Sequence, residues 1–234
     1  MKITALLDNF NDFIQKIGQK DHEITKIEFD SRRVSPGTLF FALEGLHTDG
    51  HKYIDKAIGL GALAICHTQE LENYNNNIVY IKVTDSKKSL SKLSAKFNNY
   101  PCSKLKVIGV TGTDGKSTTV KLIDQFLELL NRQVGYISTI SYKTSNIEEK
   151  NVLRQSTPEA NQIHSILNSM LDNGKEFAIV ESTSHGLSNK TGRLLDVDYN
   201  VGVLTNITQE HLEFHGTIGQ YIEDKGNLFR KIGN

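Results

Sequence analysis

Residues 109–119 read GVTGTDGKSTT, a glycine-rich turn from which the fold class follows. The apolar run KLKVIGV precedes this turn, and TTVKLIDQFLELLN, with apolar residues at helical spacing, follows it. A buried strand, a glycine-rich turn and a helix in this order are typical of a phosphate-binding loop in an α/β protein. Val110 stands where the pattern G-x-x-x-x-G-K-[ST] has its first glycine, so we expect Gly112 to make the turn.

The turn carries the groups that a nucleoside triphosphate requires. Its backbone N–H groups can point at phosphates, Lys116 can reach the β and γ phosphates, and the Ser117 hydroxyl can bind Mg²⁺. A glycine-rich turn without any ligand is the alternative, and the combination of strand, GKS and helix disfavours it. The predicted ATP-binding residues are Thr111, Gly112, Thr113, Asp114, Gly115, Lys116, Ser117 and Thr118.

The strand, loop and helix order continues after the turn. Predicted strands at QVGYIST, EFAIVES and DYNVGVLTNI are separated by helices such as PEANQIHSILNSML, which indicates a mainly parallel sheet covered on both faces. A ligand site in such a sheet lies at the carboxyl ends of the strands. The polar run KTSNIEEKNVLRQ, residues 143–155, is predicted to be an exposed loop.

The first hundred residues form a second α/β pattern. Residues 1–18 predict an amphipathic helix ended by Gly18, and strands are predicted at ITKIEF, GTLFFAL, ALAIC and NIVYIKV. A helix precedes ALAIC, and another begins near Asp85. Pro101 then interrupts the pattern, so we expect one domain over residues 1–101 and a second over residues 102–234.

The amino-acid composition argues against nucleic acid and membranes as binding partners. Lysine plus arginine and aspartate plus glutamate are 27 each, so no net charge attracts nucleic acid or an anionic membrane. No apolar run approaches the length of a membrane span. Cys66 and Cys102 are the only cysteines, as expected of reduced thiols. We expect a cytoplasmic monomer that binds small molecules.

Four motifs in order resemble one family. The loop TGTDGKS is similar to T-G-T-x-G-K-[ST] of the Mur ligase family, the ATP-dependent amide ligases of peptidoglycan precursor synthesis. Residues 156–160 (STPEA), 181–187 (ESTSHGL) and 205–217 (TNITQEHLEFHGT) resemble the motifs that follow it. Four positions depart from the commonest family residues: Asp114, Ser117, Thr183 and Glu210.

Each later motif also has a structural interpretation. Thr157 can be the N-cap of a helix that has Pro158 at its first position. His185 can be a hydrogen-bonded turn residue, and His211 and His215 can share a helix surface by coincidence although their spacing suits metal ligands.

The first domain also resembles part of the family. Residues 30–65, which begin DSRRVSPG and include HTDGH, are similar to the uridine-nucleotide domain of the Mur ligases that add the third amino acid to UDP-N-acetylmuramoyl-L-alanyl-D-glutamate. The resemblance implies contacts with the uridine diphosphate from Ser31, Arg32, His47, Thr48 and Asp49.

The resemblance implies a mechanism in which ATP phosphorylates a carboxylate and an amine attacks the acyl phosphate. Lys116, His211 and Lys225 are then the catalytic residues. Ser117 and Glu181 are implied ligands of one Mg²⁺, and His211 with Lys225, as a carbamate, of a second. A solvent-exposed helix lysine is the alternative for Lys225. The implied muramyl-dipeptide contacts are Ser156, Thr157, Thr183 and Arg193.

Three other functions share some of these features. A small-molecule kinase would explain GKS, a polyglutamate ligase would explain the whole loop, and an inactive fragment could bind only a nucleotide or UDP-sugar. Family members continue beyond the length of this chain, so we expect an incomplete ATP-binding domain and no ligation by residues 1–234 alone. The sequence does not distinguish diaminopimelate, lysine and ornithine as the added amino acid.

Overall fold

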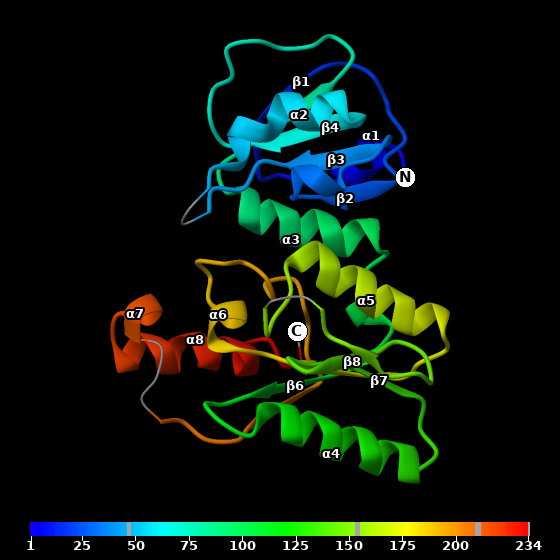
Figure 1. Ribbon diagram of the computed structural model, residues 1–234, viewed down its shortest axis with the longest axis vertical. Helices are drawn as coiled ribbons and strands as arrows, with labels where there is room; N and C mark the ends of the chain where they lie inside the picture. The colour runs from blue at the N-terminus through cyan, green and yellow to red at the C-terminus, as the bar shows by residue number, and fades with distance from the viewer. Residues whose placement is uncertain (46–47, 153–154, 209–211, 234) are drawn as a thin grey trace. The chain divides into compact units, whose positions relative to one another are not determined.

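The computed structural model describes residues 1–45, 48–152, 155–208 and 212–233 (Figure 1). The chain forms two compact units, Met1–Phe97 and Asn98–Asn234. Both are α/β units with mainly parallel sheets, which confirms the predicted fold class. None of the helices within the described ranges has the length and apolarity to cross a lipid bilayer.

The first unit is built on a five-stranded sheet with the order β1-β5-β4-β3-β2. Strands β2 to β5 are parallel, and β1 is antiparallel to β5. The helices α2 and α3 lie on opposite faces of this sheet (Figure 1). The elements in chain order are α1 (Ile3–Leu7), β1 (Phe13–Ile17), β2 (Lys26–Glu28), η1 (Ser31–Arg33), β3 (Thr38–Phe41), η2 (Gly50–Tyr53), α2 (Ile54–Gly59), β4 (Ala62–His67), β5 (Val79–Val83) and α3 (Ser86–Phe97).

The helix predicted over residues 1–18 is wrong in its second half. The helix α1 ends at Leu7, Asn9 takes a left-handed conformation with φ of 54°, and Phe13–Ile17 forms β1. Pairing with the edge of β5 satisfies the backbone of this segment, although Phe13 and Ile14 stay exposed. Tertiary pairing therefore overrides a helical pattern of apolar residues.

The second unit contains a six-stranded sheet with the order β11-β6-β10-β7-β8-β9. The four strands β11, β6, β10 and β7 are parallel, and β8 and β9 extend the sheet as antiparallel strands. The elements in chain order are η3 (Pro101–Ser103), β6 (Lys106–Thr111), α4 (Lys116–Leu129), β7 (Val134–Ile137), β8 (Ser141–Lys143), β9 (Glu149–Lys150), α5 (Ala160–Asp172), β10 (Phe177–Glu181), α6 (Ser184–Leu187), β11 (Val201–Leu204), α7 (Leu212–His215) and α8 (Ile218–Arg230).

The central strands of this sheet are buried on both faces. Along β10, Ala178 and Val180 pack with α5 and α8, whereas Ile179 packs with Val120 of α4 on the other face. Figure 1 shows α4 and α5 on opposite sides of the sheet. Continuous burial explains why the parallel strands could be recognised as unbroken apolar runs.

The segment predicted to be an exposed loop, residues 143–155, is partly a hairpin. Lys143 ends β8, and β9 pairs with β8 through Tyr142 opposite Glu149. Lys143 is buried between Asp124 and Glu128 of α4, and these ion pairs attach the hairpin to that helix. The strands β8 and β9 could not be recognised in the sequence, because the side chain that packs the hairpin against α4 is charged rather than apolar.

Close packing of α8 on two neighbouring glycines sets the position of that helix. Gly109 of β6 lies opposite Gly202 of β11, and the Leu228 side chain occupies the space above both. A Cβ atom on Gly109 would lie 2.6 Å from a Leu228 methyl carbon, and one on Gly202 would collide with the other methyl group. The helix therefore approaches the backbone of the sheet directly.

Candidate active site

The glycine-rich turn between β6 and α4 is fixed by the segment that follows β11. The Thr113 N–H donates to the Asn206 carbonyl at 3.0 Å, and the Asp114 N–H donates to the Asn206 side chain at 3.0 Å. The Thr205 hydroxyl donates to the Asp114 carbonyl at 2.6 Å. Gly112 abuts the same hydroxyl, and any Cβ there would overlap it, so the turn requires glycine at this position as predicted.

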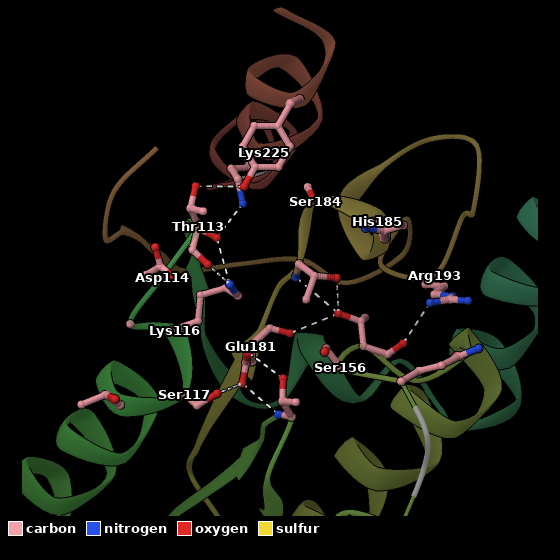
Figure 2. A pocket seen from close by; sticks show the side chains of 18 residues that line it. Thr113, Asp114, Lys116, Ser117, Ser156, Glu181, Ser184, His185, Arg193 and Lys225 are labelled. Carbon is pink, nitrogen blue, oxygen red and sulfur yellow. Dashed lines mark hydrogen bonds between the residues drawn. The ribbon is translucent and has the colours of Figure 1, made fainter. Parts of the chain in front are cut away.

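Two lysines converge on the turn. The Lys116 Nζ donates to the carbonyls of Gly112 and Thr113 at 3.0 and 2.5 Å, and the Lys225 Nζ donates to Gly112 at 2.6 Å (Figure 2). Lys225 is only 2% exposed and its ammonium lies 4.4 Å from the centre of the Tyr221 ring. The interpretation of Lys225 as a solvent-exposed lysine is therefore wrong.

A buried carboxylate lies beside the start of α4. The Glu181 carboxylate, at the end of β10, accepts from the Ser117 hydroxyl at 2.8 Å and from the N–H and hydroxyl of Thr139, each at 2.8 Å. Carboxylate and hydroxyl oxygens fit the preference of Mg²⁺ for hard ligands. Thr139 was missed by sequence reasoning, although its place just after β7, at the carboxyl edge of the sheet, is a signal that could have found it.

The opposite wall is built by the segments before α5 and around α6. The Thr157 and Thr183 hydroxyls lie 2.8 Å apart, and Arg193 donates to the Thr157 carbonyl at 3.2 Å. Arg193 also pairs with Glu159 at 2.6 Å. Thr157 is not the N-cap of α5, because Glu159 caps that helix in a capping box with Gln162.

These groups surround one cavity of about 520 Å³ at the carboxyl ends of β6, β7 and β10. Figure 2 shows its phosphate-loop side chains facing those of the opposite wall. Tyr221, Ser184, His185 and Gln155 also line it, and sequence reasoning assigned none of them to a ligand. Candidate residues in its wall are Gly112, Thr113, Asp114, Gly115, Lys116, Ser117, Thr118, Ser156, Thr157, Glu181, Thr183, Arg193 and Lys225. Thr111 is buried at the end of β6, directly before this wall.

The histidines of the later motifs have different environments. His211 lies outside the described residues. His215 is buried, and its ring nitrogens contact Asp224 and Ser184 rather than open space. His185 lines the cavity with its ring centre 4.1 Å from that of Phe214. Within the described ranges, no group of three histidine, cysteine, aspartate or glutamate side chains is arranged to hold a metal ion.

The candidate uridine-nucleotide residues belong to the first unit. Ser31 is buried at the start of η1, and Arg32 is exposed and paired with Asp30 at 2.7 Å. Hydrogen bonding from Arg32 lowers the pKa of Asp30. Asp49 accepts from the His51 N–H and contacts the His51 Nδ1 at 2.6 Å, Thr48 is exposed, and His47 lies outside the described residues.

Comparison with known proteins identifies the family. Residues 110–234 match the Mur ligase middle domain, and residues 23–98 match the catalytic domain of the Mur ligase family. The chain belongs to the Mur ligase family. The resemblance predicted from the four motifs is thereby confirmed.

Two relatives in the Mur ligase family share one name. The chain is 46% identical over 234 residues to a UDP-N-acetylmuramyl-tripeptide synthetase of Borreliella afzelii, covering 98% of this chain and 46% of the relative. A protein of the same name from Treponema denticola is 46% identical over 221 residues, which are 89% of this chain and 42% of that one. The chain thus spans less than half the length of these curated relatives.

Solved Mur ligase structures share the architecture. The chain superposes on a UDP-N-acetylmuramoyl-L-alanyl-D-glutamate–2,6-diaminopimelate ligase with a TM-score of 0.71 and 28% identity, covering 89% of this chain and 41% of that one. The MurF ligase of Thermotoga maritima in complex with ADP gives a TM-score of 0.63 at 26% identity, over 92% of this chain and 45% of that one.

Proposed function

We propose that this chain is part of an ATP-dependent ligase that adds the third amino acid to UDP-N-acetylmuramoyl-L-alanyl-D-glutamate in the cytoplasm. The observation that carries the proposal is that the phosphate loop, the Ser117–Glu181 pair and the Thr157–Thr183–Arg193 wall face one another across one cavity. The names of the relatives support the same reaction and substrate.

The phosphate loop is the proposed ATP site. Lys116 and Lys225 both donate to carbonyl oxygens of the loop, so both side chains already lie beside the proposed phosphate site. When a nucleotide binds, Lys116 exchanges these carbonyls for phosphate oxygens and neutralises charge as the phosphoryl group moves. Asp114 is exposed, so solvent weakens its repulsion of the phosphates.

Ser117 and Glu181 are the proposed holders of Mg²⁺, which supplies charge neutralisation between the phosphates when it is bound. The Glu181 carboxylate is held by Thr139, so it needs little reorganisation to act as a ligand. His211 and Lys225, the latter as a carbamate, are proposed for a second Mg²⁺ on the basis of the family resemblance.

The wall opposite the phosphate loop is the proposed site of the muramyl-dipeptide, whose carboxylate accepts the phosphoryl group. Arg193 carries a positive charge at the cavity and is oriented by Glu159, which suits recognition of the substrate's carboxylates. Ser156, Thr157 and Thr183 add hydroxyl groups along the same wall. Alignment of the carboxylate with the γ phosphate is then the main contribution of the protein to catalysis. Ser31, Arg32, His47, Thr48 and Asp49 are proposed to bind the uridine diphosphate.

The proposed function is tested by product analysis. A polypeptide with the length of the relatives is mixed with ATP, Mg²⁺, UDP-N-acetylmuramoyl-L-alanyl-D-glutamate and, separately, diaminopimelate, lysine or ornithine. We expect equal amounts of ADP and of one UDP-tripeptide. ADP formation with a folate or a simple kinase substrate, and none with the muramyl-dipeptide, would falsify the proposal.

A further inference from the structure

Three side chains behind the cavity form a continuous hydrogen-bonded chain. The His215 Nδ1 lies 2.7 Å from an Asp224 carboxylate oxygen, and its Nε2 lies 3.0 Å from the Ser184 hydroxyl. The His215 side chain is fully buried, and Asp224 and Ser184 are 3% and 2% exposed. The contacts run from a carboxylate through an imidazole to a hydroxyl. None of these three side chains has a role in the proposed function.

The carboxylate determines which nitrogen of the imidazole carries the proton. An ionised carboxylate can only accept hydrogen bonds, so the Nδ1 of His215 must donate to Asp224. Asp224 also accepts from the Gln220 amide at 3.2 Å, so two donors satisfy it without a second charge. In the neutral ring Nε2 is then an acceptor, and the hydrogen bond it makes must come from the Ser184 hydroxyl.

This arrangement uses the only hydrogen of the Ser184 hydroxyl. The remaining lone pairs of that oxygen can accept but not donate. Ser184 lines the cavity, where Figure 2 shows it between Lys225 and His185. A ligand group beside it must therefore supply a hydrogen.

We propose that Ser184 is a ligand-binding residue that accepts an N–H from the substrate, and that His215 and Asp224 are positioning residues that hold its hydroxyl in the accepting state. The inference rests on the proposed function for the identity of the ligand. Both substrates of the proposed reaction carry N–H groups: the incoming amino acid has its amine, and the muramyl-dipeptide has its amides.

The same hydrogen bonds link two parts of the site. Asp224 directly precedes Lys225, whose ammonium donates to the Gly112 carbonyl of the phosphate loop. The His215 ring is enclosed by Tyr221, Phe214 and His185, with ring centres 5.2, 4.7 and 5.2 Å away. The wall with Ser184 is thus connected to the helix that faces the phosphate loop.

The proton position is tested on the 234-residue chain without ligand. Nitrogen-15 NMR of the histidine side chains, with His215→Phe used to assign the signals, should show a neutral ring protonated at Nδ1. Ser184→Ala should leave this tautomer in place. A ring protonated at Nε2, or at both nitrogens, would overturn the accepting role of Ser184 whatever the activity of the protein.

Ligand recognition is tested by steady-state kinetics in a polypeptide with the length of the relatives. Ser184→Ala should raise KM for one N–H-bearing substrate about tenfold, the effect of one hydrogen bond, and leave KM for ATP unchanged. Ser184→Thr keeps the hydroxyl and should restore most of the loss. A shift in KM for the amino acid identifies its amine as the donor, and a shift in KM for the UDP-dipeptide identifies an amide.

The matched control is Ser188→Ala, which removes a buried hydroxyl just after α6 that does not line the cavity. It should change neither KM. Equal effects of Ser184→Ala and Ser188→Ala, or an equal rise in every KM, would overturn the ligand contact in favour of a purely structural role. Absence of any turnover by the unmodified protein would instead refute the proposed function, and the NMR result would still decide the state of Ser184.

Discussion

Among the described residues, the ammonium of Lys116 is held by the loop that is the proposed phosphate site. Its ammonium bonds to two carbonyls within four residues of its own position and contributes no described hydrogen bond to a distant element. We predict that Lys116→Ala lowers ADP affinity about tenfold to a hundredfold, because charge-assisted bonds to phosphate are lost. Calorimetric titration of the chain measures this, and Lys121→Ala on the same helix, whose amine points to Glu148, is the control.

Lys225 allows a chemical test of the proposed carbamate. In a polypeptide with the length of the relatives, Lys225→Ala should lose most turnover, and short carboxylic acids such as formate should restore part of it by occupying the vacated space. Lys225→Arg retains a positive charge but cannot form a carbamate, and it should not respond to the acids. A full rate in Lys225→Ala without additive would remove this residue from the catalytic set.

His164 makes the second unit sensitive to acid. It is fully buried on α5, neither ring nitrogen has a hydrogen-bond partner among the described residues, and burial lowers its pKa to about 3. Below pH 6.5 the unfolded chain binds a proton that the folded chain refuses, so stability falls as pH falls toward 3. At pH 5 the loss should be about 2 kcal/mol relative to pH 7.5. Urea unfolding at both pH values should show a smaller loss in His164→Leu.

At the scale of elements, the β8–β9 hairpin depends on a buried ion pair. Lys143 and Asp124 are both almost completely buried, and burial raises the pKa of Asp124. Lys143→Met leaves that carboxylate without its cation and should destabilise the second unit by about 3 kcal/mol. The double variant Lys143→Met, Asp124→Leu should recover most of this loss in urea unfolding. Lys121→Met, which breaks the exposed pair with Glu148, should cost under about 1 kcal/mol.

Elements were predictable where burial leaves a signal in the sequence. The apolar runs at β4, β5, β6 and β10 and the strand–turn–helix around Gly112 could be recognised because these strands are buried on both faces. The strand β1 could not be, since its apolar residues have helical spacing and only its pairing with β5 makes it extended. The hairpin was missed because its packing is ionic.

The candidate site was predictable to the extent that its residues follow strands. Lys116 and Ser117 begin α4 after the turn that follows β6, and Glu181 ends β10, so all three lie at the edge where a parallel sheet concentrates ligands. Ser184 and Tyr221 were not assigned to a ligand because their roles depend on contacts across 31 and 108 residues of chain. No local pattern encodes such contacts.

For the whole molecule, the boundary between the two units is the feature that can be tested. Along the chain, the first unit ends at Phe97 and the second begins at Asn98. Asn99 and Tyr100 have left-handed φ angles of 56° and 51°, and Tyr100 is 52% exposed. We predict that limited proteolysis cuts between about residues 98 and 106 and leaves an N-terminal fragment that stays folded and binds UDP weakly. Mass spectrometry of the fragments and calorimetry with UDP measure this. Early cuts inside β2–β5 would show that the first unit does not fold independently.

The seating of Leu228 on Gly109 and Gly202 has a genetic consequence. Lys225 lies one helical turn before Leu228 on the same side of α8, so a side chain added beneath Leu228 lifts the lysine away from the phosphate loop. In a growth-based mutational scan, alanine at position 109 or 202 should score as badly as a lost ligand contact. A second-site change to a smaller residue at position 228 should act as a suppressor at position 202, whereas the Tyr199 ring, 2.7 Å from a Cβ on Gly109, would still oppose alanine at position 109.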